Sequence, residues 1–310
     1  VSEKEEPTMR LMVAGGVNSS GIVVGTTKTR DVSSLSGAWV SSATMTPRWN
    51  YNLVLLPDGK VFATGGNGIQ STGIEQPVFT PQIWDPAGNG GAGSWTPASG
   101  SGALPANSLV RTYHSTAILL PDGRVLCAGG EHPYDKYRAD VFCPSYLFNV
   151  DGSPATRPVI QSSPRHVSFG QTFIVGVNTG ANVASMCLIR PAATTHGFDE
   201  NQRFVPLTYA LTAPNAPGGT YYKVTVPSDS SVVPPGDYML FVLNAGGTPS
   251  IANWVRLGRT VASSAQPTAV TNLRKQCSDG TSVTLLWTPP GTVVEPAIAQ
   301  VLVELVRVGL

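Results

Sequence analysis

The chain contains one pattern twice: TPRWNYNLVLLPDGKVFATGG at residues 46–66 and VRTYHSTAILLPDGRVLCAGG at residues 110–130. Each copy is an apolar run, then Leu-Pro-Asp-Gly, then a second apolar run that ends in Gly-Gly. Pro-Asp-Gly is typical of a tight turn, because proline fixes φ at its first central position and glycine accepts a positive φ near its end. The flanking runs therefore predict a hairpin in each copy, over residues 53–66 and 117–130.

A degenerate third copy, MRLMVAGG, precedes these two. The three Gly-Gly pairs begin at Gly15, Gly65 and Gly129, and the spacings of 50 and 64 residues suit the blades of a β-propeller. The phrases PQIWDP and ADVFCP supply outer strands, so each repeat predicts a four-stranded blade of the kelch type. The continuous apolar runs LVLL and AILL indicate buried inner strands. The alternative is an ordinary β-sandwich that reuses one hairpin.

Composition narrows the class of protein. Of 310 residues, 33 are Gly and 26 Pro, which disfavours a helical bundle, and 41% are hydrophobic, which disfavours a disordered chain. Charged residues make up 13% and the formal net charge is +1, which argues against a nucleic-acid partner. No apolar stretch is long enough for a transmembrane helix. The four cysteines show no CxxC metal spacing.

Strands of another kind follow residue 155: QTFIVGV, ASMCLIRP, YYKVTVP, DYMLFVLN and NWVRLG. Their spacing near ten residues predicts an immunoglobulin-like sandwich. Further on, NLRKQCSDGTSVTLLWTPPG is similar to the opening strands of a fibronectin type III module, of which only about 50 residues are present. We therefore expect an all-β chain in three parts: a partial kelch β-propeller of two to three blades (1–155), the sandwich (156–259), and a linker with the incomplete fibronectin type III module (260–310).

The C-terminal sequence VLVELVRV is rich in β-branched residues and predicts a fibronectin-type strand over residues 300–307. Gln300, Glu304 and Arg307 fall at helical spacing, so a short helix is the alternative.

A family resemblance appears at RTYHS, LPDGRV, THGFDENQR and PPGDYMLFVLNAGGTPSIANWV. There the chain resembles the galactose oxidase and glyoxal oxidase family, the copper radical oxidases, from about Met45 to Gly258. The similarity covers the family's last blades and its C-terminal early-set sandwich domain. The resemblance implies a secreted enzyme that oxidises a small primary alcohol, aldehyde or carbohydrate and reduces O2 to hydrogen peroxide.

The resemblance also implies a copper site. It makes Tyr113 an axial ligand and the catalytic base that accepts the substrate's hydroxyl proton, and it makes His114 and His196 equatorial ligands. Adjacent strand residues point to opposite faces, so Tyr113 and His114 can face one metal only where the backbone bends at a strand's entry. Imidazole and phenolate together suit Cu(II). The alternatives are a hydrogen-bonded pair at the inner end of a blade for Tyr113 and His114, and an ordinary loop histidine for His196.

The sequence departs from the family in one respect. The family's radical resides on a tyrosine that is covalently joined to a cysteine in early blades, and Cys127, Cys143, Cys187 and Cys277 lie outside any matching motif. The Cys-Tyr cofactor is therefore expected only in upstream sequence, and this chain by itself is expected to be inactive. The second hypothesis is a non-catalytic extracellular protein of the same architecture that binds glycans or proteins.

Overall fold

A computed structural model describes seven stretches of the chain: residues 10–32, 37–71, 75–133, 135–216, 218–258, 271–278 and 283–288. The chain divides into two compact units, Val1–Gly258 and Arg259–Leu310. In the described stretches the regular structure is β-strands and three short 3₁₀ helices, and no helix could span a membrane. The predicted all-β fold class is therefore confirmed. The 3₁₀ helices are Asn89–Gly91, Asp135–Tyr137 and Ser145–Leu147.

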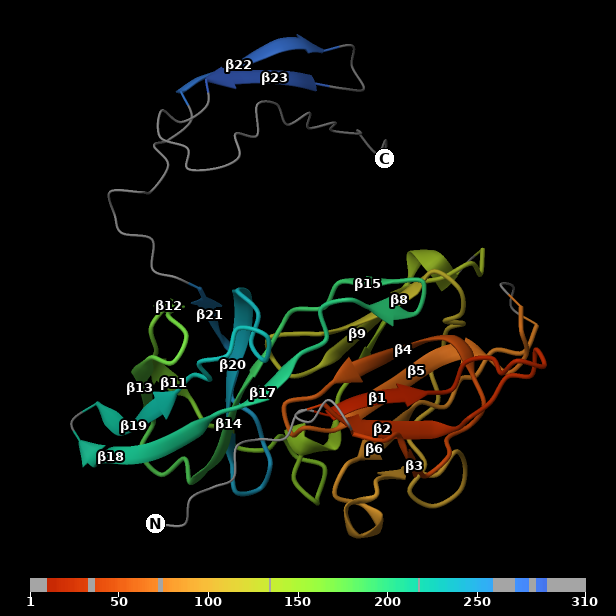
Figure 1. Cartoon of the computed structure of the whole chain (residues 1–310), viewed down its shortest axis with the longest axis horizontal. Helices are drawn as coiled ribbons and strands as arrows, with labels where there is room; N and C mark the ends of the chain where they lie inside the picture. Colours follow the sequence, from red (N-terminus) through yellow and green to blue (C-terminus); the bar gives the residue numbers. More distant parts are fainter. Residues whose placement is uncertain are drawn as a thin grey trace. The chain divides into compact units, whose positions relative to one another are not determined.

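Three antiparallel sheets follow one another along the first half of the chain (Figure 1). The first has the order β1-β2-β3, the second β4-β5-β6-β7 and the third β10-β9-β8. Their strands are β1 (Arg10–Ala14), β2 (Thr27–Asp31), β3 (Val40–Ser42), β4 (Trp49–Leu55), β5 (Val61–Asn67), β6 (Gln82–Asp85), β7 (Ser94–Trp95), β8 (Ser115–Leu119), β9 (Val125–Gly129) and β10 (Ala139–Phe142).

Both predicted hairpins are present. Strands β4 and β5 pair antiparallel up to Leu55 opposite Val61, and β8 and β9 pair up to Leu119 opposite Val125. The prediction of four strands is right for the second sheet and wrong for the described parts of the other two. In each hairpin the second strand, β5 or β9, leads into a Gly-Gly pair. Strand β1 also leads into a Gly-Gly pair, so it corresponds to the second strand of a hairpin. After β10 the chain turns through Pro144 into a 3₁₀ helix and leaves the sheet.

The LVLL and AILL runs are not continuously buried, which corrects the interpretation of both as fully buried strands. Strands β4 and β8 alternate between buried and half-buried residues, whereas every residue of β5 is buried. Strand β5 lies inside its sheet and contributes to two clusters. Phe62 packs in the cluster that contains Leu119, and Ala63 packs with Met45.

The Gly-Gly pairs join successive blades. The Gly16 N–H donates to the carbonyl of Arg48 (3.0 Å), and the Gly66 N–H donates to the carbonyl of Arg111 (2.6 Å). Both glycines have a positive φ, of 87° and 95°. A Cβ on Gly65 would lie 2.2 Å from the carbonyl oxygen of Arg111, so only glycine permits this approach.

The second half of the first unit is a sandwich of two sheets, with the orders β11-β13-β19-β18 and β12-β21-β20-β14-β17. All neighbouring strands are antiparallel except β12 and β21. The strands are β11 (Ile160–Ser162), β12 (His166–Val167), β13 (Thr172–Val177), β14 (Val183–Ile189), β17 (Phe204–Pro206), β18 (Thr208–Ala216), β19 (Gly219–Thr225), β20 (Gly236–Asn244) and β21 (Asn253–Leu257).

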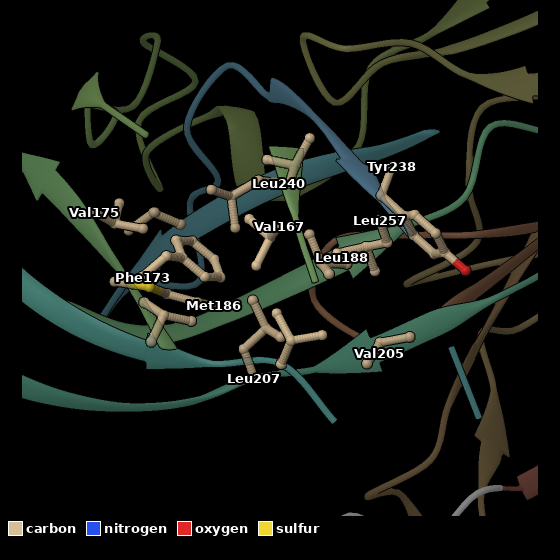
Figure 2. Packing of buried hydrophobic residues seen from close by; sticks show 14 of the residues in the cluster. Val167, Phe173, Val175, Met186, Leu188, Val205, Leu207, Tyr238, Leu240 and Leu257 are labelled. Carbon is tan, nitrogen blue, oxygen red and sulfur yellow. The ribbon is translucent and has the colours of Figure 1, made fainter. Parts of the chain in front are cut away.

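Strand β20 and the second half of β14 are buried on both faces because alternate residues enter two clusters. One face fills the sandwich, as Figure 2 shows for Met186, Leu188, Tyr238 and Leu240. The opposite face packs with blade residues; this cluster contains Cys187, Ile189, Met239, Phe241 and Leu243 together with Leu56, Phe62, Leu119 and Val125. The sandwich is thus fixed on the blades by an apolar core, so its loops have defined positions against β4 and β8.

In the second unit the structure describes one antiparallel pair, β22 (Thr271–Ser278) with β23 (Val283–Thr288). Residues 300–307 lie outside the described residues, so the strand expected there stays a prediction. The same holds for the fibronectin type III module as a whole.

Candidate metal centre

Tyr113 and His114 lie in a turn immediately before β8 begins at Ser115. His114 has a left-handed backbone with φ of 61°, and the N–H of Ser115 closes the turn onto the carbonyl of Thr112 at 3.0 Å. This bend turns the two neighbouring side chains to the same side. Their ring centroids are 3.9 Å apart, with planes inclined at 30°. The predicted bend at the strand entry is therefore present.

His196 comes from the sandwich. It lies at the tip of the hairpin formed by β15 (Thr194–Thr195) and β16 (Phe198–Asp199), with φ of 53°. This hairpin lies against β8 and β4 (Figure 1). A Cβ on Gly197 would lie 2.9 Å from the carbonyl oxygen of Tyr51, so the glycine lets the tip approach the blade backbone closely.

The three side chains converge. The Nε2 atoms of His114 and His196 are 3.1 Å apart, and the ring of Tyr113 lies 5.5 Å from the ring of His196, edge to face. Each imidazole has a partner at its other nitrogen. His196 Nδ1 lies 2.6 Å from Oγ1 of Thr195, and His114 Nδ1 is hydrogen-bonded to the carboxylate of Glu131. Both Nε2 atoms thus face one point from different domains.

This donor set fits copper. Metal–nitrogen bonds of about 2 Å place two adjacent ligand atoms about 3 Å apart, as the two Nε2 atoms are. No group of three His, Cys, Asp or Glu side chains in the described part of the chain is arranged to hold a metal ion. The third candidate donor is the phenol of Tyr113, whose ring lies 3.9 Å from that of His114 and 5.5 Å from that of His196. Two nitrogen donors and one oxygen donor are the mixture that Cu(II) accepts.

The candidate centre is open to solvent. The side chains of His114 and Glu131 are each 46% exposed, and His196 is exposed as well. Phe198, two residues beyond His196, is 73% exposed. Small solutes can therefore reach the imidazoles in this chain.

The other histidines lie elsewhere. His132 Nδ1 is 3.1 Å from the carboxylate of Asp135, and His166 is an exposed residue of β12.

The three cysteines whose side chains are described are free, and two of them keep their protons at neutral pH. Cys127, Cys143 and Cys187 are free thiols, and the first and third are buried. Burial raises the pKa of Cys127 to about 11 and raises that of Cys187 further, so both hold their protons at neutral pH.

Sequence reasoning missed Glu131 and Thr195, the partners of the two imidazoles. Comparing the repeats could have found the first. Glu131 directly follows Gly-Gly, where the earlier copy has Asn67, just as His114 takes the place of Asn50. A histidine and an acid that appear together in one copy indicate a paired role. Thr195 gives no such signal, because it adjoins His196 in any conformation.

Known proteins resemble this chain in sequence and in structure. Residues 157–257 match the galactose oxidase-like, early set domain family. The chain is 38% identical over 213 residues to a galactose oxidase of Gibberella zeae, covering 66% of this chain and 28% of that protein. It is 37% identical over 221 residues to the aldehyde oxidase GLOX of Vitis pseudoreticulata, covering 66% of this chain and 40% of that one.

A solved structure is similar over a longer stretch. It is described as a novel fungal alcohol oxidase with catalytic diversity among the AA5 family, in complex with copper. The TM-score is 0.70 and the identity 28%, over 81% of this chain and 52% of that one. The chain therefore spans about half or less of the length of these relatives.

Proposed function

Because the chain is a homologue of galactose oxidase and of the aldehyde oxidase GLOX, with a galactose oxidase-like early set domain, we propose that it is the C-terminal part of a secreted copper radical oxidase. In the proposed reaction a primary alcohol, or the hydrate that an aldehyde forms with water, loses two electrons and two protons, and O2 gains them to form hydrogen peroxide. The observation that carries the proposal is the convergence of Tyr113, His114 and His196 from two domains.

Each residue has a role in this proposal. His114 and His196 hold the metal through Nε2, with their Nδ1 atoms fixed by Glu131 and Thr195. Copper, when bound, supplies the one-electron redox chemistry. The phenolate of Tyr113 accepts the substrate's hydroxyl proton, which makes Tyr113 the general base. The second one-electron group, a tyrosine joined to a cysteine, is proposed to lie in upstream sequence.

The experiment is peroxide release from a copper-loaded form of the protein that includes the upstream blades, assayed against a panel of primary alcohols and aldehydes. Tyr113→Phe removes the proton acceptor and leaves both histidines in place. We expect turnover to fall by about 10²-fold or more, the usual contribution of a general base, while copper stays bound. Unchanged turnover would contradict the role of Tyr113. A form that binds no copper and releases no peroxide would favour the non-catalytic binding protein instead.

A further inference from the structure

His114 and Glu131 face each other across the open end of the β8–β9 hairpin. His114 immediately precedes β8, and Glu131 follows the Gly-Gly that ends β9. In the preceding blade the equivalent positions hold Asn50 and Asn67. There the Nδ2 of Asn67 donates to the carbonyl of Ser71, within its own loop. Both blades contain the same hairpin. Of the two copies, only the one in the third sheet has an imidazole and a carboxylate at these positions.

The hydrogen bond between His114 and Glu131 determines which ring nitrogen of His114 carries the hydrogen. An ionised carboxylate can only accept hydrogen bonds, so a neutral His114 bonded to Glu131 must carry its hydrogen on Nδ1. The lone pair of a neutral imidazole then lies on Nε2, and this atom is the one that faces Nε2 of His196 at 3.1 Å. A hydrogen bond to a charged acceptor is roughly twice as strong as a neutral one, which favours this tautomer even at a half-exposed site.

Asp135, the next acid after Glu131 along the chain, is engaged elsewhere. Asp135 accepts the backbone N–H of Val110 at 2.8 Å and lies 3.1 Å from His132 Nδ1. Glu131 is therefore the carboxylate that acts on His114.

We propose that Glu131 is a positioning residue, which holds His114 in the Nδ1–H tautomer and directs the Nε2 lone pair to the point that His196 also faces. The consequence for copper rests on the proposed function, whereas the tautomer does not. A carboxylate behind a ligating histidine also raises the basicity of the ligand, and losing such a partner typically costs 10- to 100-fold in metal affinity.

The first test concerns the metal-free 310-residue chain. At about pH 8.5, where an ordinary histidine is neutral, the ¹⁵N NMR shifts of the imidazole report the tautomer directly. We expect a dominant Nδ1–H form of His114 in the wild type and a shift toward Nε2–H in Glu131→Ala. Glu75→Ala is the matched control, because Glu75 is an exposed acid in a blade loop that bonds the hydroxyl of Ser71 and lies outside the candidate centre. The same tautomer in the wild type and in Glu131→Ala would overturn the proposal.

The second test is Cu(II) titration with electron paramagnetic resonance. We expect Glu131→Ala to weaken binding 10- to 100-fold and to change the copper hyperfine splitting, whereas Glu131→Gln, which keeps an acceptor oxygen, should lose less than 10-fold. Equal affinity and spectra for wild type and Glu131→Ala would overturn the positioning role. If the wild type binds no copper, the proposed function fails, and the tautomer measurement still decides the role of Glu131.

Discussion

Asn50 and His114 occupy the same position in two repeats, and both have a left-handed backbone, with φ of 53° and 61°. Asparagine and histidine tolerate this region better than most residues, and β-branched residues tolerate it poorly. The fold therefore imposes the backbone at this position, and the residue type decides what the position can do.

The first prediction follows from this equivalence. His114→Asn should fold with nearly wild-type stability, because asparagine already occupies the equivalent turn. His114→Val should lose about 1–2 kcal/mol of unfolding free energy, because it strains the left-handed turn. Urea denaturation compares the two variants. Equal stability of the Val and Asn variants would contradict the strain argument.

The glycines that join blades should differ sharply in their tolerance of alanine. At Gly65 a Cβ would meet the carbonyl oxygen of Arg111 at 2.2 Å, whereas at Gly16 it would meet nothing within 4 Å. Gly65→Ala should therefore cost about 3 kcal/mol or more, from backbone strain and displacement of the next blade, and Gly16→Ala about 1 kcal/mol from φ alone. Thermal unfolding of the two variants measures this, and the reverse order would refute the role of Gly65.

Alkaline pH should destabilise the chain partly through Cys127. Burial raises the pKa of this thiol from the ordinary value near 9 to about 11 in the folded state. The stabilisation is fully present below pH 9 and is lost as pH rises to about 11, because the unfolded thiol ionises first. The two pH units correspond to about 2–3 kcal/mol.

We expect the unfolding free energy of wild type to fall more between pH 8 and pH 10.5 than that of Cys127→Ala. Groups common to both proteins cancel in this comparison. Parallel profiles for the two proteins would show that the thiol does not contribute.

The hairpins could be predicted from sequence because Pro-Asp-Gly and the apolar runs are local signals. The left-handed turn at His114 was inferred only as a bend, from the requirement that Tyr113 and His114 face one side. What could not be predicted depends on contacts between distant segments. Periodicity shows that Cys187 and Ile189 lie on the same face of a strand. It does not show that this face packs against the blades instead of the sandwich core.

Part of the candidate centre could likewise be predicted from sequence, and part could not. The motif resemblance selected the three converging residues, which the structure brings together. Glu131 was not predicted because its contact with His114 depends on the hairpin register, which aligns residues 17 positions apart. The repeat pattern also did not predict the number of strands in the first and third sheets, because this number depends on where the chain enters and leaves each sheet.

We infer that His196, which belongs to the sandwich, shares one metal with His114. Electron paramagnetic resonance on the copper-loaded 310-residue chain tests it most directly, through the nitrogen hyperfine pattern of wild type and His196→Ala, with His166→Ala as the control for an exposed histidine outside the centre. We expect weak Cu(II) binding with two equivalent imidazole nitrogens in wild type and in the control, and one in His196→Ala. A spectrum that is unchanged by His196→Ala would contradict it.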